Sequence, residues 1–277
     1  MTASAAPLAL HTLLAAAIDY AGLFPPAALG MDAAVDAYAR HRAGPDAWAL
    51  GRFVLPVARL AEFAGVADTR RAHGWPLAVI GGDDPQADAA TIRAVHAALA
   101  PIGAEVELLE ARVATVADVA ARRAAAAPVR QLVLEVPLDP DPSSLIDAVV
   151  AAGAWPKART GGLVASAFPA PAQLARFLAA CARAGTPHKV TAGLHHPCRG
   201  AYRLTYAPDA PTGVMFGFLN VMAAADALAH GGTEAEAVRL LELARPPVPA
   251  ARGLLAGFGS CSFDEPLADL RTLGLLP

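Results

Sequence analysis

The chain has 277 residues, of which 55% are hydrophobic and 17% charged, and its formal net charge is −3. This composition supports a large buried core and excludes a disordered chain, and the lack of a basic run argues against nucleic acid as a partner. No apolar stretch reaches transmembrane length without a charge, and the N-terminal residues lack the basic region of a secretory signal, so we expect a cytoplasmic protein with no membrane partner. The three cysteines match no metal or disulfide spacing, which is typical of a reducing compartment.

Short apolar runs recur along the chain, and each is followed by an alanine-rich segment with a helical pattern. In chain order, the runs predicted to be strands are residues 52–56, 76–80, 105–109, 131–135, 154–159, 188–192 and 214–218. An eighth strand is placed near Ile18, although residues 13–20 also fit a helix. The helices with the clearest starts and ends are predicted at residues 85–99, 116–126 and 169–184.

The predicted strands begin roughly 23 to 34 residues apart, which is the size of one βα unit. Repeated units of this size predict a single (β/α)8 barrel domain over residues 1–277, with residues 246–277 as a C-terminal extension that packs on the barrel. The alternative is a doubly wound open parallel sheet. Against that alternative, no glycine-rich dinucleotide loop or Walker loop follows the first strands.

Two basic residues differ from all the others. Lys157 and Lys189 are the only lysines of the chain, since every other Lys or Arg position holds arginine. An arginine keeps its proton in proteins, whereas a lysine can lose it and become a nucleophile. Neighbouring strands lie about 5 Å apart, so two inward-facing ammonium groups would lower each other's pKa and leave one neutral amine near pH 7. The alternative is that two solvated lysines survive by chance in an arginine-rich composition.

The segments Lys157-Ala-Arg-Thr-Gly161 and Lys189-Val-Thr-Ala-Gly193, with a predicted helix between them, resemble the paired-lysine strands six and seven of class I aldolases of the deoxyribose-phosphate aldolase type. The resemblance implies that Lys157 forms an imine, that Lys189 tunes its pKa, and that Glu110 on strand four moves protons. The chain departs from that family in two places. The Gly-Gly phosphate loop after the second lysine is missing, and Arg159 stands where a small residue is expected. A phosphorylated sugar is therefore not expected as the substrate, and a barrel with its own chemistry is left open.

A pair of histidines follows the second lysine segment. By alternation along a strand, Lys189 and Thr191 share a face, and His195 continues it. His195 can serve as a general acid or base, or His195 and His196 can hold a divalent metal ion together with an acidic residue. Adjacent histidines on an extended chain point in opposite directions, so we expect only one of them, His195, to face the pocket. No His-x-His or His-x-x-x-His spacing is present, so we expect no metal cofactor and keep a divalent metal as the alternative.

Further polar residues are placed at predicted strand ends. Glu135 ends an otherwise apolar strand, Asp19 precedes a proline-containing turn, and Asn220 is expected at the end of strand eight. Each residue also has a structural alternative. Glu135 could be an ion-pair partner, Asp19 a solvated residue at a helix end, and Asn220 a helix cap. The polar run at residues 259–264 fits either a lid over the pocket or a serine-rich turn.

These observations lead to one main hypothesis and two alternatives. The main hypothesis is a carbon–carbon lyase of aldolase type that acts on a small anionic carbonyl compound. Its catalytic residues would be Lys157, Lys189, Glu110, Glu135 and His195, and its substrate-binding residues Arg159, Thr191, Asn220 and Asp19. The alternatives are a metal-dependent barrel hydrolase or isomerase that uses His195 and His196, and a non-catalytic barrel that binds an anionic metabolite. The sequence identifies neither the substrate nor the oligomeric state, and a homo-oligomer is compatible with it.

Overall fold

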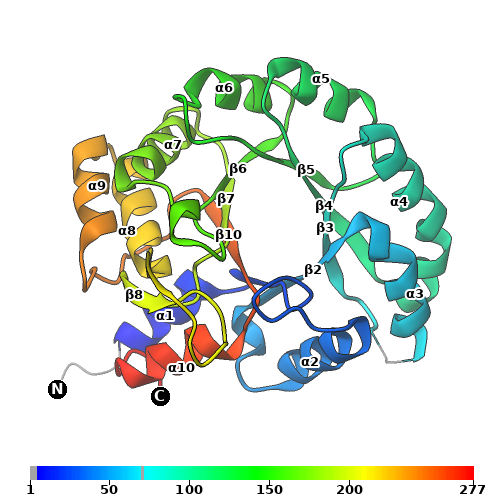
Figure 1. Cartoon of the computed structure of the whole chain (residues 1–277), viewed down its shortest axis with the longest axis horizontal. Helices are drawn as coiled ribbons and strands as arrows, with labels where there is room; N and C mark the ends of the chain where they lie inside the picture. Colours follow the sequence, from blue (N-terminus) through cyan, green and yellow to red (C-terminus); the bar gives the residue numbers. More distant parts are fainter. Residues whose placement is uncertain (1–4, 70–71) are drawn as a thin grey trace.

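The structure is a computed structural model that describes residues 5–69 and 72–277. Over these residues, eight parallel strands form a closed barrel with helices around it (Figure 1). The order around the barrel is β1 (Ile18–Tyr20), β10 (Leu255–Ser260), β7 (His188–Thr191), β6 (Trp155–Arg159), β5 (Gln131–Glu135), β4 (Glu105–Arg112), β3 (Pro76–Ile80) and β2 (Leu50–Pro56). This arrangement confirms the predicted (β/α)8 barrel and shows that the open-sheet alternative is wrong.

Some helices of the outer ring begin at side-chain caps that the sequence offers. Asp84 accepts hydrogen bonds from the backbone N–H groups of Gln86 and Ala87 at the start of α4, and Thr115 and Asp118 form a reciprocal capping box at the start of α5. The helices are α1 (Ala5–Leu14), α2 (Met31–Ala43), α3 (Leu60–Thr69), α4 (Pro85–Leu99), α5 (Val116–Ala124), α6 (Ser143–Ala151), α7 (Pro171–Arg183), α8 (Phe218–Ala229), α9 (Glu234–Glu242) and α10 (Asp264–Thr272). Short 3-10 turns occur at Ala47–Ala49, Val57–Arg59, Ala100–Ile102 and Ala165–Ala167. Among the described residues, no helix is long and apolar enough to cross a membrane.

Along the strands, one layer of inward-facing side chains in the barrel is apolar and the next layer is charged. Val54, Ala78, Leu108 and Val133, one from each of β2 to β5, pack together as a small buried cluster. Strand alternation places Glu110 and Glu135 on the same inward face, two residues further along their strands. A larger core of leucine, alanine, valine and phenylalanine side chains lies between the strands and the helices. The charged level is therefore held between rigid strands rather than on loops.

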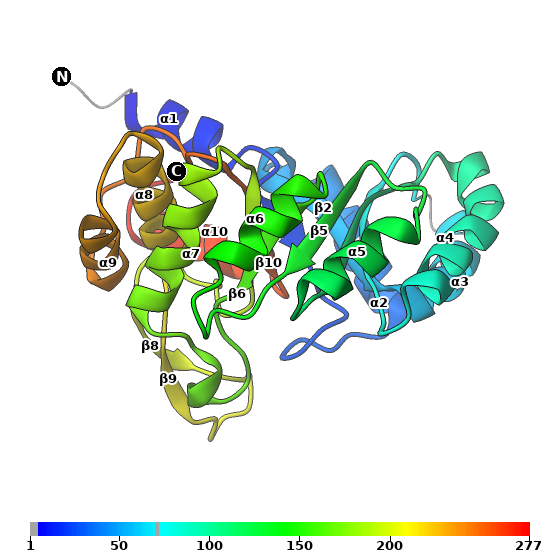
Figure 2. The same cartoon turned by 90° about the horizontal axis from the view of Figure 1, so that it is seen from above.

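The strand placed near Ile18 is confirmed as β1, but the last barrel strand in chain order is not the predicted one. Residues 214–218 were predicted as a barrel strand, but Thr212–Met215 is β9, which pairs antiparallel with β8 (Gly200–Arg203) outside the barrel, and Phe218 begins α8. The alternating burial of β9 fits a half-exposed hairpin. Figure 2 shows this hairpin projecting beyond the ring of helices.

The barrel is closed by β10, which lies within the segment expected to pack on the barrel as an extension. Residues 246–277 instead contribute β10, between β1 and β7, and α10 to the barrel fold itself. Gly257 of β10 is in register with Lys189, and Gly259 with Thr191. A Cβ at position 259 would lie 2.9 Å from the Thr191 hydroxyl, so this strand approaches β7 too closely for a side chain there. The glycines that make β10 a poor strand by propensity are thus the ones that close packing requires.

Candidate active site

A pocket of about 1220 Å³ opens at the carboxyl ends of the barrel strands. Its wall includes charged side chains from five strands, namely Asp19, Glu110, Arg112, Glu135, Lys157, Arg159 and Lys189. Residues 203–206 and Met215 of the projecting hairpin also line it, so the hairpin contributes to the pocket mouth. The catalytic groups of (β/α)8 enzymes lie at this end of the barrel, which makes the pocket the candidate active site.

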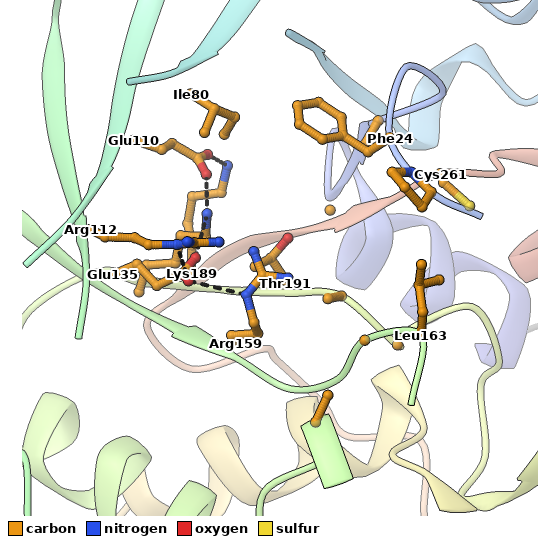
Figure 3. Close-up of a pocket in the computed structure, with 18 of the residues that line it drawn as sticks. Phe24, Ile80, Glu110, Arg112, Glu135, Arg159, Leu163, Lys189, Thr191 and Cys261 are labelled. Carbon is orange, nitrogen blue, oxygen red and sulfur yellow. Dashed lines mark hydrogen bonds and ion pairs between the residues drawn. The ribbon is translucent and has the colours of Figure 1, made fainter. Parts of the chain in front are cut away.

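The two lysines are joined by one carboxylate. Lys157 and Lys189 are in register on β6 and β7, and both are almost fully buried. Lys157 Nζ donates to Glu110 Oε2 at 2.7 Å, and Lys189 Nζ donates to Glu110 Oε1 at 2.5 Å. Lys189 Nζ also donates to Asp19 Oδ2, and Lys157 Nζ lies 3.0 Å from Glu135 Oε2. Figure 3 shows Glu110, Glu135 and Lys189 gathered on one side of the pocket. The result is a buried chain of alternating charges, in the order Asp19, Lys189, Glu110, Lys157 and Glu135.

These contacts stabilise the ionised forms of the buried groups. Burial alone would raise the pKa of Glu110, but the ammonium groups of Lys157 and Lys189 lower it to about 2. The pKa of Glu135 is likewise lowered, against the effect of burial, by Lys157 and Arg159. Burial opposes the charged form of Lys189, yet Asp19 and Glu110 raise its pKa above the ordinary value.

The expectation that the two ammonium groups would lower each other's pKa is therefore wrong for Lys189. The physical reason is that a carboxylate lies between the two lysines and compensates both positive charges. Lys189 and Glu110 hold each other ionised.

Two arginines continue the chain of charges toward the pocket mouth. Arg159 Nε donates to Glu135 Oε1 at 3.1 Å, and Arg112 Nε lies 3.5 Å from the same oxygen. The side chains of Arg159 and Arg112 are 44% and 80% exposed, so both keep N–H groups open to solvent. Thr191, in register with Arg159, also lines the pocket. A ligand with an anionic group would meet these guanidinium groups before it reached Lys157.

Asp19 lies in the charge chain and is 1% exposed. Its Oδ1 accepts the backbone N–H of Arg52 at 2.7 Å, and its Oδ2 accepts from Lys189. Both carboxylate oxygens are thus already bonded within the protein. The geometry supports a role in holding the Lys189 ammonium more than the predicted role in binding substrate.

The two histidines both line the pocket but have separate partners. His195 Nδ1 lies 3.2 Å from Glu265 Oε2, whereas His196 Nδ1 lies 2.6 Å from Asp269 Oδ2 and its ring stacks on Tyr202 with 3.5 Å between ring centroids. Within the described parts of the chain, no three His, Cys, Asp or Glu side chains are grouped so as to hold a metal ion. The expectation that only one of the two histidines faces the pocket is wrong, because β7 ends at Thr191 and the positive φ angles of Ala192 and Gly193 break the strand alternation before His195.

Asn220 is not at the end of a barrel strand. It lies in the first turn of α8 and is fully buried. Its Nδ2 donates to the carbonyl oxygens of Leu240 and Leu243, both at 2.8 Å, and its Oδ1 accepts the backbone N–H of Arg199 at 2.9 Å. The amide therefore joins α8 to the end of α9 and to the loop before β8. This contradicts the position that motivated its assignment as a substrate-binding residue.

The structure adds pocket residues that the sequence did not single out. Arg112 follows Glu110 by two residues on β4, so strand alternation alone could have identified it. Cys261, Glu265 and Tyr206 also line the pocket, the first two because β10 is a barrel strand. If β10 had been predicted as a barrel strand, the polar residues 259–264 would have been placed at the end of that strand, at the active site, rather than in an ambiguous turn.

Comparisons of this chain with protein-family models, with curated proteins and with solved structures found no match. The functional argument therefore depends on the geometry of the site. In chain order around the barrel, Glu110 lies on the fourth strand, Lys157 on the sixth and Lys189 on the seventh. These are the positions that the resemblance to class I aldolases implied for an acid and a lysine pair.

Proposed function

We propose that the protein is a carbon–carbon lyase that acts on a small anionic carbonyl compound through an imine on Lys157. The observation that carries the proposal is the bridging of two buried lysines by the Glu110 carboxylate at the carboxyl ends of neighbouring barrel strands. An ion pair that only stabilised the fold could stay on the solvent-exposed surface, without the desolvation cost of these buried groups. Buried charge clusters that face a pocket are candidate catalytic sites because the protein bears their desolvation cost.

Lys157 is the better imine-forming residue because of its position in the charge chain. Lys189 is held between two buried carboxylates, Asp19 and Glu110, which favour its ammonium form. Lys157 also contacts two carboxylates, Glu110 and Glu135, but the Glu135 carboxylate contacts the half-exposed Arg159 as well. A ligand that enters from the mouth can therefore perturb the partner of Lys157 without breaking the Lys189 contacts.

Glu135 is the candidate proton acceptor and donor for Lys157. An ammonium group must lose a proton before its nitrogen can form a bond to a carbonyl carbon. Glu135 Oε2 lies 3.0 Å from Lys157 Nζ and can accept that proton. Loss of water from the resulting carbinolamine needs a proton on the departing oxygen, and protonated Glu135 can return it. In the protonated imine, a base such as the Glu135 carboxylate takes the proton of a hydroxyl group on the β-carbon, the C–O bond becomes a C=O bond, and the electron pair of the bond between the α- and β-carbons moves toward the positively charged nitrogen. The second fragment leaves as a carbonyl compound, and the first stays on Lys157 as an enamine, which is released by protonation at the α-carbon and hydrolysis of the imine.

An anionic substrate group would promote this proton transfer. The Arg159 guanidinium is one of the groups that lower the pKa of Glu135. A substrate carboxylate that binds Arg159 competes with Glu135 for its N–H groups, which raises the pKa of Glu135 and makes it a stronger base. Arg112 provides a second cation beside the same oxygen. Substrate binding and activation of Lys157 are thereby linked.

The test is borohydride trapping with a panel of small carbonyl compounds that differ in chain length and in the presence of a carboxylate. We expect a stable mass increase on the peptide that contains Lys157, larger for carboxylate-bearing compounds, and no increase at that peptide in Lys157→Met. Arg159→Gln serves as the matched variant, in which the preference for anionic compounds should weaken while Lys157 is retained.

Three outcomes would contradict the proposal. Trapping on Lys189 alone would exchange the roles of the lysines. Binding of an anion with neither trapping nor turnover would favour a non-catalytic metabolite-binding barrel. Turnover that is lost on chelation and restored by a divalent ion would favour the metal-dependent alternative.

A further inference from the structure

A second group of reactive side chains lies in the same pocket, around Cys261. The Cys261 Sγ lies 3.9 Å from His195 Nδ1 and 4.0 Å from His195 Nε2, and 3.5 Å from the Tyr206 hydroxyl. His195 Nδ1 lies 3.2 Å from Glu265 Oε2, and the Tyr206 hydroxyl donates to the same oxygen at 3.4 Å. All four residues line the pocket. Glu265 and the Ser260 hydroxyl, at 3.4 Å, both lie against His195 Nδ1, so Nε2 is the ring nitrogen left to exchange a proton with the thiol, while Glu265 orients the ring from the other nitrogen.

This thiol group is separate from the lysine cluster. Figure 3 shows Cys261 on the other side of the pocket from Glu110 and Lys189. Cys261 follows β10 directly, whereas the lysine cluster is carried by β1, β4, β5, β6 and β7. One pocket thus contains an amine centre and a thiol centre.

We propose that Cys261 is a second nucleophile of this pocket, which adds reversibly to the carbonyl carbon of a small anionic aldehyde with His195 as its acid and base. In the step, His195 takes the thiol proton and the sulfur electron pair forms a carbon–sulfur bond. The carbonyl π electrons move to oxygen, which takes the proton from His195. The product is a hemithioacetal, and no oxidant, reductant or further reactant is needed.

The electrostatics of the cluster agree with its geometry. Burial raises the pKa of the Cys261 thiol, but the contacts with His195, with smaller contributions from Tyr206 and the Ala27 backbone N–H, outweigh burial and lower it. Burial lowers the pKa of His195, but Cys261 and Glu265 raise it to about 9. Both shifts favour the thiolate–imidazolium pair over the neutral thiol and imidazole. The other titratable side chain coupled to the thiol is Tyr20, whose pKa burial and Cys261 together raise to about 12.

The other two cysteines provide internal controls. Cys181 is fully buried in α7, and burial raises its pKa far above the ordinary value. Cys198 lies before β8 and is half-buried, and burial raises its pKa as well. Neither is among the residues that line the pocket. A thiolate signal at neutral pH should therefore come from Cys261.

An aldehyde at Cys261 would deepen the proposed function, because cleavage of a carbon–carbon bond by an imine releases one fragment as a carbonyl compound. The thiol centre would hold that fragment while the other remains on Lys157. This link rests on the proposed lyase activity, but the addition of Cys261 to an aldehyde does not. The experiment is therefore done with Lys157→Met, which has no amine to form the imine.

The measurement is the ultraviolet absorbance of the thiolate as a function of pH, in Lys157→Met and in the same variant with Cys261→Ser. At pH 7 a thiol of ordinary pKa is about 3% ionised, so a thiolate at Cys261 should give up to about 30-fold more signal than such a thiol. His195→Gln should move the titration toward the ordinary value of about 8.5. Cys198→Ser should leave the signal unchanged.

Glyoxylate is the probe for the covalent step. It should abolish the Cys261 thiolate absorbance and protect Cys261, but not Cys198, from alkylation by iodoacetamide, and its removal should restore both. The proposal is overturned if no Cys261-dependent thiolate is present at pH 7, or if glyoxylate leaves the thiolate unchanged. Success here with no trapping at Lys157 in the wild-type protein would reject the lyase and keep the thiol centre.

Discussion

Replacement of Glu110 by glutamine tests the buried charge chain most directly. Glu110 is 3% exposed and bridges Lys157 and Lys189. A carboxyl whose pKa falls from 4.5 in the unfolded chain to about 2 in the folded protein contributes about 3 kcal/mol of stability at neutral pH. Glu110→Gln keeps the size of the side chain but leaves two buried ammonium groups without their shared anion. We expect the free energy of unfolding to fall by about 3 to 5 kcal/mol, the range for breaking a buried ion pair.

The assay is urea unfolding followed by circular dichroism at pH 7 and at lower pH. Because the folded-state pKa of Glu110 is depressed, its contribution is present above pH 4.5 and is lost as the pH falls toward 2. The wild-type protein should therefore lose stability in that interval, and Glu110→Gln should lose less. Glu105→Gln on the same strand is the matched control, since Glu105 pairs with the exposed Arg130 and should matter much less.

A second variant distinguishes charge from packing. Adding Lys157→Met to Glu110→Gln removes one of the two ammonium groups that have lost their shared carboxylate and leaves the Lys189–Asp19 pair intact. We expect the double variant to be more stable than Glu110→Gln alone. The reasoning is refuted if Glu110→Gln costs less than about 1 kcal/mol, a loss too small for an uncompensated buried charge, or if the second substitution only adds further destabilisation.

Three further predictions concern the roles of individual groups. Lys157→Arg keeps the charge without a titratable amine and should abolish turnover and trapping, whereas Lys189→Arg keeps the cation needed by Asp19 and Glu110 and should retain reduced turnover; equal rates for both variants would contradict the assigned roles. Asn220→Ala removes the three hydrogen bonds that its amide makes with the carbonyl oxygens of Leu240 and Leu243 and with the Arg199 N–H, and should lower the free energy of unfolding by about 2 to 3 kcal/mol, with the yield of trapped adduct unchanged; a loss of adduct in folded protein would return Asn220 to the site. Exhaustive chelation should leave turnover and trapping intact, and metal analysis of the purified protein checks that no stoichiometric ion is retained.

The fold could be predicted to the extent that local patterns repeat. Compact apolar runs followed by alanine-rich helices mark six of the barrel strands, β2 to β7, at their observed places. The strand that closes the barrel was not predicted because its sequence, Leu255-Ala-Gly-Phe-Gly-Ser260, has low strand propensity. Residues 214–218 are more apolar and were predicted as a barrel strand in its place. Position 259 requires glycine because β7 approaches closely there. Strand propensity does not account for such contacts between segments that are distant in the sequence.

The site was predictable where it depends on strand alternation. Because alternate side chains of a strand point to the same side, the sequence predicts that Lys157, Lys189 and Thr191 point into the barrel. The same alternation places Glu135 in the layer of Lys157. What alternation cannot supply is the identity of the nearest opposite charge across the barrel. Glu110 and Lys189 are 79 residues apart in the chain, and their contact reverses the expected direction of the Lys189 pKa shift. A pKa expectation drawn from neighbouring strands therefore needs the whole ring of inward-facing residues.

The position of β10 between β1 and β7 also has a consequence for synthesis on the ribosome. Ile18 pairs with Phe258, so the seam is formed by residues 240 positions apart, and it cannot form until β10 has left the ribosome exit tunnel. Until then, β1 and β7 are sheet edges with unpaired backbone groups, which are prone to pairing with other chains. The Lys189–Asp19 bond spans the same gap and can form only when the seam closes. Nascent chains would thus carry an incomplete charge chain, and chaperone binding or rapid release at this stage should determine how much protein folds productively.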